Sequence, residues 1–359
     1  MKIDVLVGFD QFWSALKADI ASARQSVLVQ TFAFEGDAVG NELAAAFLSA
    51  RAPERLLLAD SFTKVVLSDR FRYSPANLLN DDLRREARET TARIRELKQA
   101  GVGVRFTNPY GFTPRRILSR NHKKLVVIDD RAAYVGGINF SEHNAAWHDM
   151  MLRIESKDVV DFLRKDFRST WSGRDCAARG DFNGLELHAL DGHSNRNAFG
   201  RVLSLIDDAN RSIFVESPYI TFPFYERLRT AARRGVAVQI VTPELNNWNY
   251  FGGYARLESA CSEIDLRLYQ GRMTHLKGML IDDEILIAGS SNFDYFSYRV
   301  YQEILAIITD PDTVSSFRDR VVIPDLANAK SGDCEAGIAA RQWLGIQMKL
   351  LDAAFTILT

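Results

Sequence analysis

The chain has 359 residues, of which 47% are hydrophobic, and 45 Lys and Arg residues against 46 Asp and Glu residues give a net charge of −1. This length accommodates two domains or two fused halves. The near-neutral charge argues against a nucleic-acid binder, which typically carries a basic face. Three widely spaced cysteines, at 176, 261 and 334, form neither a disulfide framework nor a zinc motif and suit a reducing cytoplasm.

The sequences at the two ends of the chain indicate how the protein could be associated with a membrane. The first residues lack the charged start and apolar core of a signal peptide, and no window has the apolar length of a membrane-spanning helix. We therefore expect a soluble or peripheral protein. After residue 324 the sequence predicts a loop and then an apolar helix, which either docks on the core or anchors the protein at a membrane surface. Its apolar stripe comprises Trp343, Leu344, Ile346, Leu350, Leu351, Phe355, Ile357 and Leu358.

The N-terminal part of the chain alternates between helical and strand-like patterns. Apolar residues recur at helical spacing over 9–24, a strand-like run covers 26–34, and a second helix over 41–50 precedes a short buried strand over 56–59. This β-α-β order favours a parallel or mixed sheet covered by helices.

A polar constellation follows at residues 120–139. His122 and Lys124 stand two apart at the head of the apolar run 125–128, so strand geometry places both on one face. Asp129 has the opposite parity and is expected to point to the other face or into a turn. A return strand over 132–135 ends at Gly136 and Gly137, and Asn139 follows where the backbone can approach a ligand.

Basic residues surround the head of this constellation. They comprise Arg115, Arg116, Arg120, Lys123 and Lys124. The sequence leaves two interpretations open, a solvated loop or a funnel that draws an anion into a site.

The second part of the chain repeats this plan. Helices are expected over 199–209 and 224–234 and strands over 212–219 and 236–242. The constellation then recurs with the same His-to-Lys spacing of two, Lys-to-Asp spacing of five and Asp-to-small-pair spacing of seven. Its members are His275, Lys277, Asp282, Gly289, Ser290 and Asn292.

The two copies differ in length. Their opening strands are offset by 186 residues and their motif histidines by 153, so the first half is longer by 33 residues. We attribute the surplus to an insertion at about 62–95, which leads into a charged helix over 81–99. A solvent-facing insertion is favoured over a lid, although the apolar residues that precede the helix could line a substrate groove. These residues are Phe62, Val65, Val66, Leu67, Phe71 and Tyr73.

The doubled H-x-K-x4-D-x6-G-[GS]-x-N pattern resembles the phospholipase D superfamily over about residues 5–320. The flanking RNHKK and GGIN are similar to the bacterial cardiolipin synthases. The resemblance implies an α/β fold of two pseudo-twofold-related α-β-α halves, each a mixed sheet covered by helices, with the active site between them. We expect the halves at 1–173 and 193–325, a joining segment at 174–192, and the loop and apolar helix at 326–359.

Phosphoryl transfer explains why two copies are needed. One imidazole can attack phosphorus, but the departing alkoxide needs a proton from a second group. The family pattern implies His122 as the nucleophile, forming a phosphohistidine, and His275 as the acid and base. Lys124, Lys277, Asn139 and Asn292 are expected around the non-bridging oxygens, so that neither a metal nor another cofactor is expected.

The other residues of the pattern are expected in supporting roles. The resemblance implies that Asp149 and Glu303 orient the two histidines. Asp129 and Asp282 are expected to be structural, and His143, His148, His188 and His193 to be structural or on the surface. The chain departs from the synthase pattern at Asp294 to Ser297 and at Gln302, and these departures leave the acceptor open.

The resemblance implies phosphatidyl transfer between phospholipids such as phosphatidylglycerol. The alternatives are hydrolysis of phospholipids and, less favoured, a metal-independent nuclease or a non-catalytic anion-binding protein. We expect a cytoplasmic enzyme that lies peripherally on the inner face of the cell membrane and does not bind nucleic acid. The sequence leaves the oligomeric state open.

Overall fold

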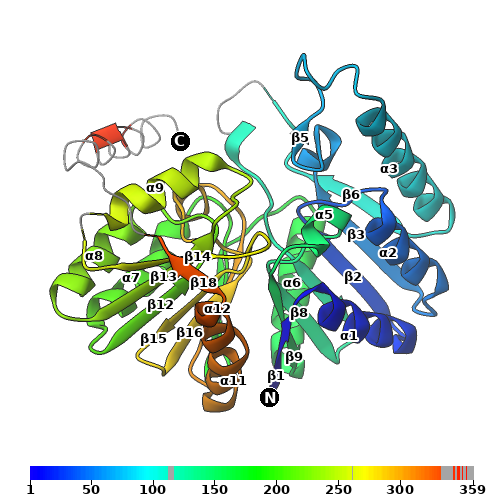
Figure 1. Ribbon diagram of the computed structural model, residues 1–359. Helices are drawn as coiled ribbons and strands as arrows, with labels where there is room; N and C mark the ends of the chain where they lie inside the picture. Colours follow the sequence, from blue (N-terminus) through cyan, green and yellow to red (C-terminus); the bar gives the residue numbers. More distant parts are fainter. Residues whose placement is uncertain are drawn as a thin grey trace.

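A computed structural model shows two mixed sheets, one in each half of the chain (Figure 1). The structure describes residues 1–111, 117–260 and 262–332, together with the single positions 343, 346, 347, 350 and 353. The predicted C-terminal apolar helix therefore lies almost wholly outside the described residues. Of its predicted stripe, Trp343, Ile346 and Leu350 are described, and all three are exposed.

The first sheet has the strand order β1-β9-β8-β7-β2-β3-β6. Its strands are β1 (Lys2–Val7), β2 (Ser26–Thr31), β3 (Glu54–Asp60), β6 (Gly103–Thr107), β7 (Leu125–Ile128), β8 (Ala132–Gly136) and β9 (Met150–Glu155). Its helices are α1 (Phe9–Ser22), α2 (Ala38–Ser49), α3 (Asp81–Gln99), α5 (Glu142–Ala145) and α6 (Lys157–Trp171). A small hairpin of β4 (Val66–Leu67) and β5 (Arg70–Phe71) precedes α3.

The second sheet has the order β10-β11-β17-β16-β15-β12-β13-β14-β18. Its strands are β10 (Ala178–Asp181), β11 (Leu185–Ala189), β12 (Ser212–Glu216), β13 (Ala237–Pro243), β14 (Asp265–Tyr269), β15 (Gly278–Ile281), β16 (Ile285–Gly289), β17 (Ile304–Ile308) and β18 (Ala329–Ser331). Its helices are α7 (Asn195–Asp208), α8 (Phe224–Arg233), α9 (Asn249–Ser259), α10 (Tyr295–Arg299), α11 (Pro311–Phe317) and α12 (Ile323–Ala327).

The two sheets repeat one pairing scheme. The order β9-β8-β7-β2-β3-β6 corresponds to β17-β16-β15-β12-β13-β14. In both halves the opening strand pairs in parallel with the next strand and antiparallel with the motif strand. The predicted α/β fold of two related halves, each a mixed sheet covered by helices, is therefore confirmed.

One hydrophobic core joins the halves. It contains Val127 and Leu163 from the first half and Leu280 and Phe317 from the second, all fully buried, so that α6 and α11 lie between the two sheets (Figure 1). Two further cores pack α1 and α2, and α7 and α8, on the opposite faces of the sheets. Because the shared core is apolar and buried, it fixes the halves relative to each other.

The segment expected to join the halves carries structure of its own. It contains β10 and β11, which extend the second sheet beyond β17. We propose that the boundary between the halves lies before β10, near Gly173.

Candidate active site

Each motif histidine is placed by the backbone of the opposite half. His122 lies just before β7, and its backbone N–H donates to the carbonyl of Gln302 at 2.9 Å. In the same way His275, before β15, donates to the carbonyl of His148 at 2.7 Å. These contacts bring the two motifs together at the junction of the sheets.

The carboxylates that orient the histidines also cross between the halves. Nδ1 of His122 lies 2.8 Å from Oε1 of Glu303, and Nδ1 of His275 lies 2.7 Å from Oδ2 of Asp149. A carboxyl oxygen that accepts the Nδ1–H of a histidine fixes the tautomer and leaves Nε2 free for a substrate. Both histidines line one cavity, together with Asn139 and Asn292.

The small residues after each return strand make room for these carboxylates. A Cβ on Gly137 would lie 2.2 Å from Oδ1 of Asp149, so a larger residue would displace this carboxylate. At the corresponding position, Ser290 donates its hydroxyl to Oε2 of Glu303. Gly289 has a φ of 147°, and a Cβ there would collide with the carbonyl of Ile304. Gly137 leaves space for Asp149, and Ser290 holds Glu303 by a hydrogen bond, so each pair helps to place an orienting carboxyl group.

Both imidazoles are held neutral. Burial lowers the pKa of His275 to about 3, and the charge of Lys277 adds to this shift. Burial and the charges of Lys124 and Lys277 likewise lower the pKa of His122 well below its usual value. Either ring is therefore available as a nucleophile or base at neutral pH.

The two carboxyl groups differ in charge. Burial raises the pKa of Glu303 to about 8, although the charge of Lys124 opposes it. Burial also opposes the charge on Asp149, but Lys277 and His275 outweigh this effect and lower its pKa. At neutral pH His275 therefore has an anionic partner, whereas the partner of His122 is largely protonated.

The two lysines are buried next to the histidines and are not among the residues that line the cavity. Each is 1% exposed, and its ammonium group donates to the backbone carbonyl of the histidine two residues earlier. Their charges still reach the rings, as the lowered pKa values of both histidines show. Direct contact with phosphate oxygens remains a prediction for Lys124, Lys277, Asn139 and Asn292.

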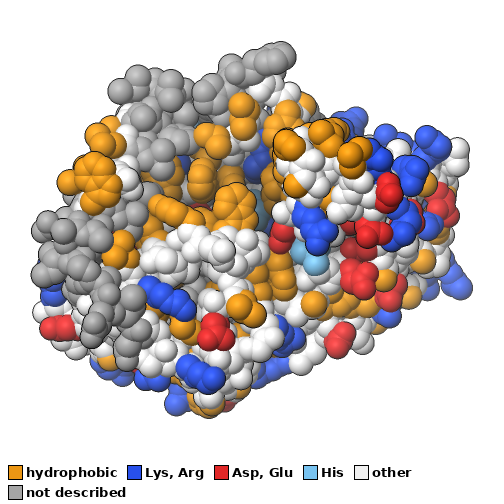
Figure 2. Space-filling view, turned by 45° about the horizontal axis from the view of Figure 1, so that its top comes forward, with side chains coloured by type: hydrophobic (Ala, Val, Ile, Leu, Met, Phe, Trp, Pro, Cys, Tyr) orange, Lys and Arg blue, Asp and Glu red, His pale blue; other side chains and the backbone are white. Residues whose placement is uncertain are grey.

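The cavity has aromatic walls from both halves. Phe32, Phe62 and Trp147 come from the first half, and Tyr219, Phe251 and Tyr301 from the second. Figure 2 shows hydrophobic side chains on both sides of a central hollow. Phe62 and Val66, which the sequence analysis singled out as possible groove residues, do line the cavity.

His143 also lies on the cavity wall, a position the sequence did not indicate. Its Nδ1 is 3.4 Å from Glu35, and its Nε2 is 3.6 Å from Asp69. Although burial opposes its charge, these two carboxylates raise the pKa of His143 to about 10. His143 is therefore positively charged at neutral pH, and it faces the same cavity as the two neutral imidazoles. Its contact with Asp69 depends on the hairpin of the insertion, which explains why no local motif reveals it.

Neither interpretation of the basic residues beside the first motif holds for Arg120 and Lys123. Both are buried, Arg120 in an ion pair with Asp60 and Lys123 in one with Asp166. They brace the motif from within instead of forming a solvated loop or an anion funnel. Arg115 and Arg116 lie outside the described residues.

Asp129 and Asp282 brace the turns after the motif strands. The Asp129 carboxylate accepts the backbone N–H groups of Arg24, Gln25 and Ser26. Asp282 does the same for residues 210–212 at the start of β12. These contacts agree with the structural role expected for both residues.

Two groups of ligand-type side chains occur among the described residues. One comprises His148, Glu216 and Asp325, and the other Glu35, Asp37 and Glu86. His148 was expected to be structural, and its contact with Asp325 agrees with this.

Solved structures share the fold of this chain. The chain is similar to phosphatidylserine synthase of Haemophilus influenzae, with a TM-score of 0.68 and 14% identity over 99% of this chain and 94% of that one. It is also similar to polyphosphate kinase of Porphyromonas gingivalis, with a TM-score of 0.61 and 12% identity over 97% of this chain and 53% of that one. At these identities the likeness shows the fold alone.

Sequence comparison shows the family to which the chain belongs. Residues 16–171 and 202–321 match the family described as cardiolipin synthase, phospholipase D-like domain, so the chain belongs to this family of phospholipase D superfamily enzymes. It is 30% identical to cardiolipin synthase B of Salmonella typhi over 98% of this chain and 86% of that protein. Cardiolipin synthase B of Escherichia coli K12 is 27% identical over the same shares. None of the helices in the described part of the chain combines the length and apolar character that a membrane crossing requires.

Proposed function

We propose that the enzyme transfers a phosphatidyl group from one phospholipid to a hydroxyl group of another, with phosphatidylglycerol-like donor and acceptor. The observation that carries this proposal is the crossed arrangement of the site. Each histidine takes its carboxylate from the opposite half, and both line one cavity. The match to cardiolipin synthases supports phospholipids as the substrate class.

The reaction proceeds in two displacements. Nε2 of His122 attacks phosphorus and forms a P–N bond while the bond to the leaving glycerol oxygen breaks. His275 gives that oxygen its proton. His275 then removes the proton of the acceptor hydroxyl, whose oxygen attacks phosphorus and displaces His122. Because an anion favours the imidazolium form, the bound phosphodiester raises the pKa of His275, so that the ring takes up a proton from solvent and can give it to the leaving oxygen in the first step.

The carboxyl groups support this order of roles. An imidazolium forms more readily beside the anionic Asp149 than beside Glu303, which burial keeps largely protonated at neutral pH. His275, held by Asp149, is therefore better suited to carry a proton. His122, held by Glu303, is better suited to remain neutral and attack.

Charge stabilisation comes from the protein itself in this proposal. The amides of Asn139 and Asn292 on the cavity wall donate to the non-bridging oxygens. Lys124 and Lys277 act through their charges from beneath the histidines. No metal ion takes part in the chemical steps.

We further propose that the mouth of the cavity docks on a membrane surface. Its rim carries exposed apolar side chains from both halves, and Trp248 both lines the cavity and is 60% exposed. Nδ2 of Asn247 contacts Asp69 at 3.2 Å, which places the hairpin of the first half beside this loop of the second. We propose that this rim is formed by the exposed apolar residues of the hairpin, of the segment before α3 and of the segment around Trp248, which are Phe71, Tyr73, Leu78, Leu79, Leu245, Trp248 and Tyr250.

Hydrolysis is the second candidate function. Asp294 and Phe296, where the chain departs from the synthase pattern, both line the cavity. A change at the acceptor side could favour water over a glycerol hydroxyl without altering the histidine chemistry.

One assay separates the candidates. The purified enzyme is incubated with phosphatidylglycerol vesicles in EDTA, and the lipids are resolved by mass spectrometry. Cardiolipin with released glycerol indicates the transferase, and phosphatidic acid indicates the hydrolase. Cleavage of plasmid DNA in a parallel digest would instead indicate a nuclease.

We expect His122→Ala and His275→Ala each to abolish turnover in this assay. His188→Ala is the matched control, because His188 contacts Glu186 within the second half and does not line the cavity. A lipid adduct on the peptide that carries His122, in acid-free digests of wild-type enzyme, would identify the nucleophile. Substantial turnover by either active-site variant would contradict the shared site.

A further inference from the structure

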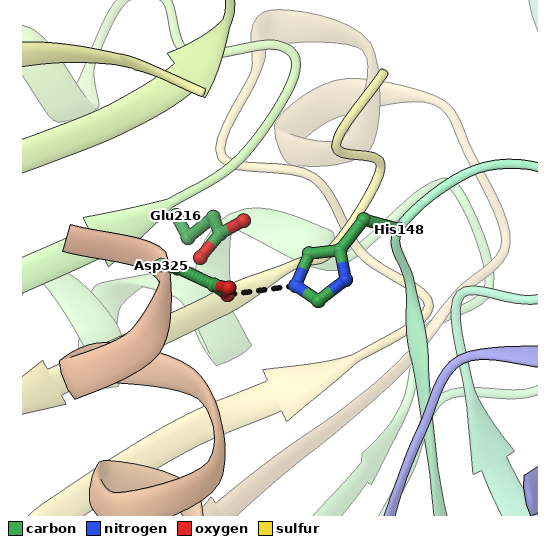
Figure 3. A group of neighbouring side chains, drawn as sticks. All are labelled: His148, Glu216 and Asp325. Atoms are coloured by element: carbon green, nitrogen blue, oxygen red, sulfur yellow. Dashed lines mark hydrogen bonds and ion pairs between the residues drawn. The ribbon is translucent and has the colours of Figure 1, made fainter. Parts of the chain in front are cut away.

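Three side chains of the kind that bind metal ions lie close together in the protein interior, next to the segments that carry Asp149 and His275. His148 immediately precedes Asp149, Glu216 ends β12, and Asp325 lies in α12. Their side chains point toward one another (Figure 3), and one ligand atom from each lies within 4.8 Å of the others. Their exposed fractions are 4%, 0% and 4%. They do not line the active-site cavity.

Hydrogen bonds offset only part of the charge of this group. The Arg272 guanidinium lies 3.3 Å from Nδ1 of His148, so one arginine stands beside two carboxyl groups. Nε2 of His148 lies 2.7 Å from Oδ2 of Asp325, and Thr274 donates its hydroxyl to Oε1 of Glu216. Oε2 of Glu216 has no hydrogen-bond partner, although it is fully buried. Burial and the neighbouring Asp325 raise the pKa of Glu216 well above its usual value. Two carboxyl groups that face each other away from water need a proton or a cation between them.

The other half of the same chain provides an internal comparison. Gln30 in β2 corresponds to Glu216, and Gln302, just before Glu303, corresponds to His148; Asn121, just before His122, corresponds to Thr274. Both pairs of segments are joined by the same isolated bridge, Asn121 to Gln302 in one case and Thr274 to His148 in the other. Where the first motif is supported by neutral amides, Gln30 donating to Asn121 at 2.9 Å, the second is supported by an imidazole and carboxylates. At the positions of Glu216 and His148, the fold therefore does not itself require ionisable groups.

We propose that His148, Glu216 and Asp325 bind a divalent transition-metal ion of the zinc type. One imidazole nitrogen and two carboxylate oxygens are ligands that such ions accept, with distances of about 2.0–2.2 Å. The ion's two positive charges offset the two carboxylates, and the proton that the carboxyl groups share is released to solvent. Nε2 of His148 takes the ion while its proton moves to Nδ1, which gives up its contact with Arg272. The ion ties α12 and β12 to the segment that carries Asp149. Its role is structural, and the proposal does not depend on the proposed function.

Metal content measures the site directly. The full chain is stripped with a chelator, reloaded with ZnCl2, freed of excess metal by gel filtration and measured by elemental mass spectrometry. We expect one zinc ion per wild-type chain, and at least about tenfold weaker binding in Glu216→Gln and Asp325→Asn. Glu86→Gln, in the other acidic group, is the matched control and is expected to bind as the wild type does.

Two measurements on the wild type avoid any dependence on folding of the variants. Zinc is expected to raise the thermal midpoint and EDTA to lower it, because a ligand that binds only the folded state stabilises it. X-ray absorption at the zinc edge is expected to show an oxygen and nitrogen shell with a single imidazole. No stoichiometric zinc, unchanged binding in both variants, or a shell with two imidazoles, as expected from His122 with His275, would each overturn the proposal. Neither measurement uses a lipid substrate, so the result is separate from that of the lipid assay.

Discussion

At the scale of single residues, the site depends on carboxyl groups that lie far away in sequence from the rings they hold. Glu303 is 181 residues from His122, and Asp149 is 126 residues from His275. Each half by itself would contain a histidine without its orienting acid. Single substitutions of these acids therefore test the crossed arrangement directly.

We expect Asp149→Asn and Glu303→Ala each to lower kcat by about 10²–10⁴-fold, because a misoriented imidazole transfers protons poorly. Glu284→Gln is the matched control, since Glu284 is an exposed residue of the same half that pairs with Arg211. The measurement is the rate of product formation from phosphatidylglycerol at saturating lipid. Rates near wild type in both variants would show that the carboxylates do not orient the histidines.

Lys277 gives the site a pH dependence on its basic side. Burial lowers the pKa of Lys277 to about 8, although Asp149 attracts its charge. As pH rises through 8 the ammonium loses its proton, and the positive charge near the phosphoryl group is lost. We expect kcat to fall above about pH 8 and this inflection to move to lower pH in Asp149→Asn, where the attraction is absent. A pH profile that stays flat to pH 9.5 would contradict this role for Lys277.

At the scale of elements, the sequence predicted the local parts of the site well. The motif strands at 125–128 and 132–136 and helix α3 follow directly from apolar periodicity and turn residues. The crossing of Glu303 and Asp149 could not be predicted, because nothing in either half specifies which ring its acid will meet. Arg120 and Lys123 looked like surface residues because their acidic partners, Asp60 and Asp166, lie 60 and 43 residues away.

The contribution of Asp129 and Asp282 to the turns after the motif strands can be tested by substitution. Asp129 has a φ of 48° and Asp282 a φ of 55°, a conformation that Asn also tolerates, so Asp→Asn removes the charge alone. We expect Asp129→Asn to lower the free energy of unfolding by about 1–3 kcal/mol, with kcat unchanged, because the buried backbone donors lose a charged acceptor. The exposed neighbour gives the matched control, Asp130→Asn, and chemical denaturation measures both.

At acidic pH, the difference in the free energy of unfolding between wild type and Asp129→Asn should disappear. Burial opposes the charge on Asp129, but the N–H groups of residues 24–26 outweigh it and hold the pKa of Asp129 below its usual value. The stabilisation is thus fully present above the unfolded pKa of about 3.9 and is lost as pH falls through the folded one. The difference in the free energy of unfolding between wild type and Asp129→Asn should become smaller below pH 4. A difference that stays constant with pH would show that the charge of Asp129 is not its source.

At the scale of the whole molecule, the shared core holds the two halves so that their loops form one rim. The most exposed apolar residue of this rim, Leu79, is 78% exposed and precedes α3 in the first half, and Trp248 lies on the second half. Leu245 and Tyr250 flank Trp248 on that side. A surface of this kind, with aromatic residues beside the mouth, suits insertion into the headgroup region of a bilayer.

Substitution on either side of the rim should therefore weaken attachment to lipid. Fully burying a Leu side chain is worth about 1.5–3 kcal/mol, so Leu79→Asp is expected to reduce partitioning onto phosphatidylglycerol vesicles at least about tenfold in cosedimentation. Trp248→Asp should act in the same direction from the other half, whereas the control Ile323→Asp, at an exposed position of α12, should not. The thermal midpoint of Leu79→Asp is expected to match that of the wild type, because the side chain is exposed. If both rim variants sediment as the wild type does, the rim is not the docking surface, and attachment must come from another part of the chain.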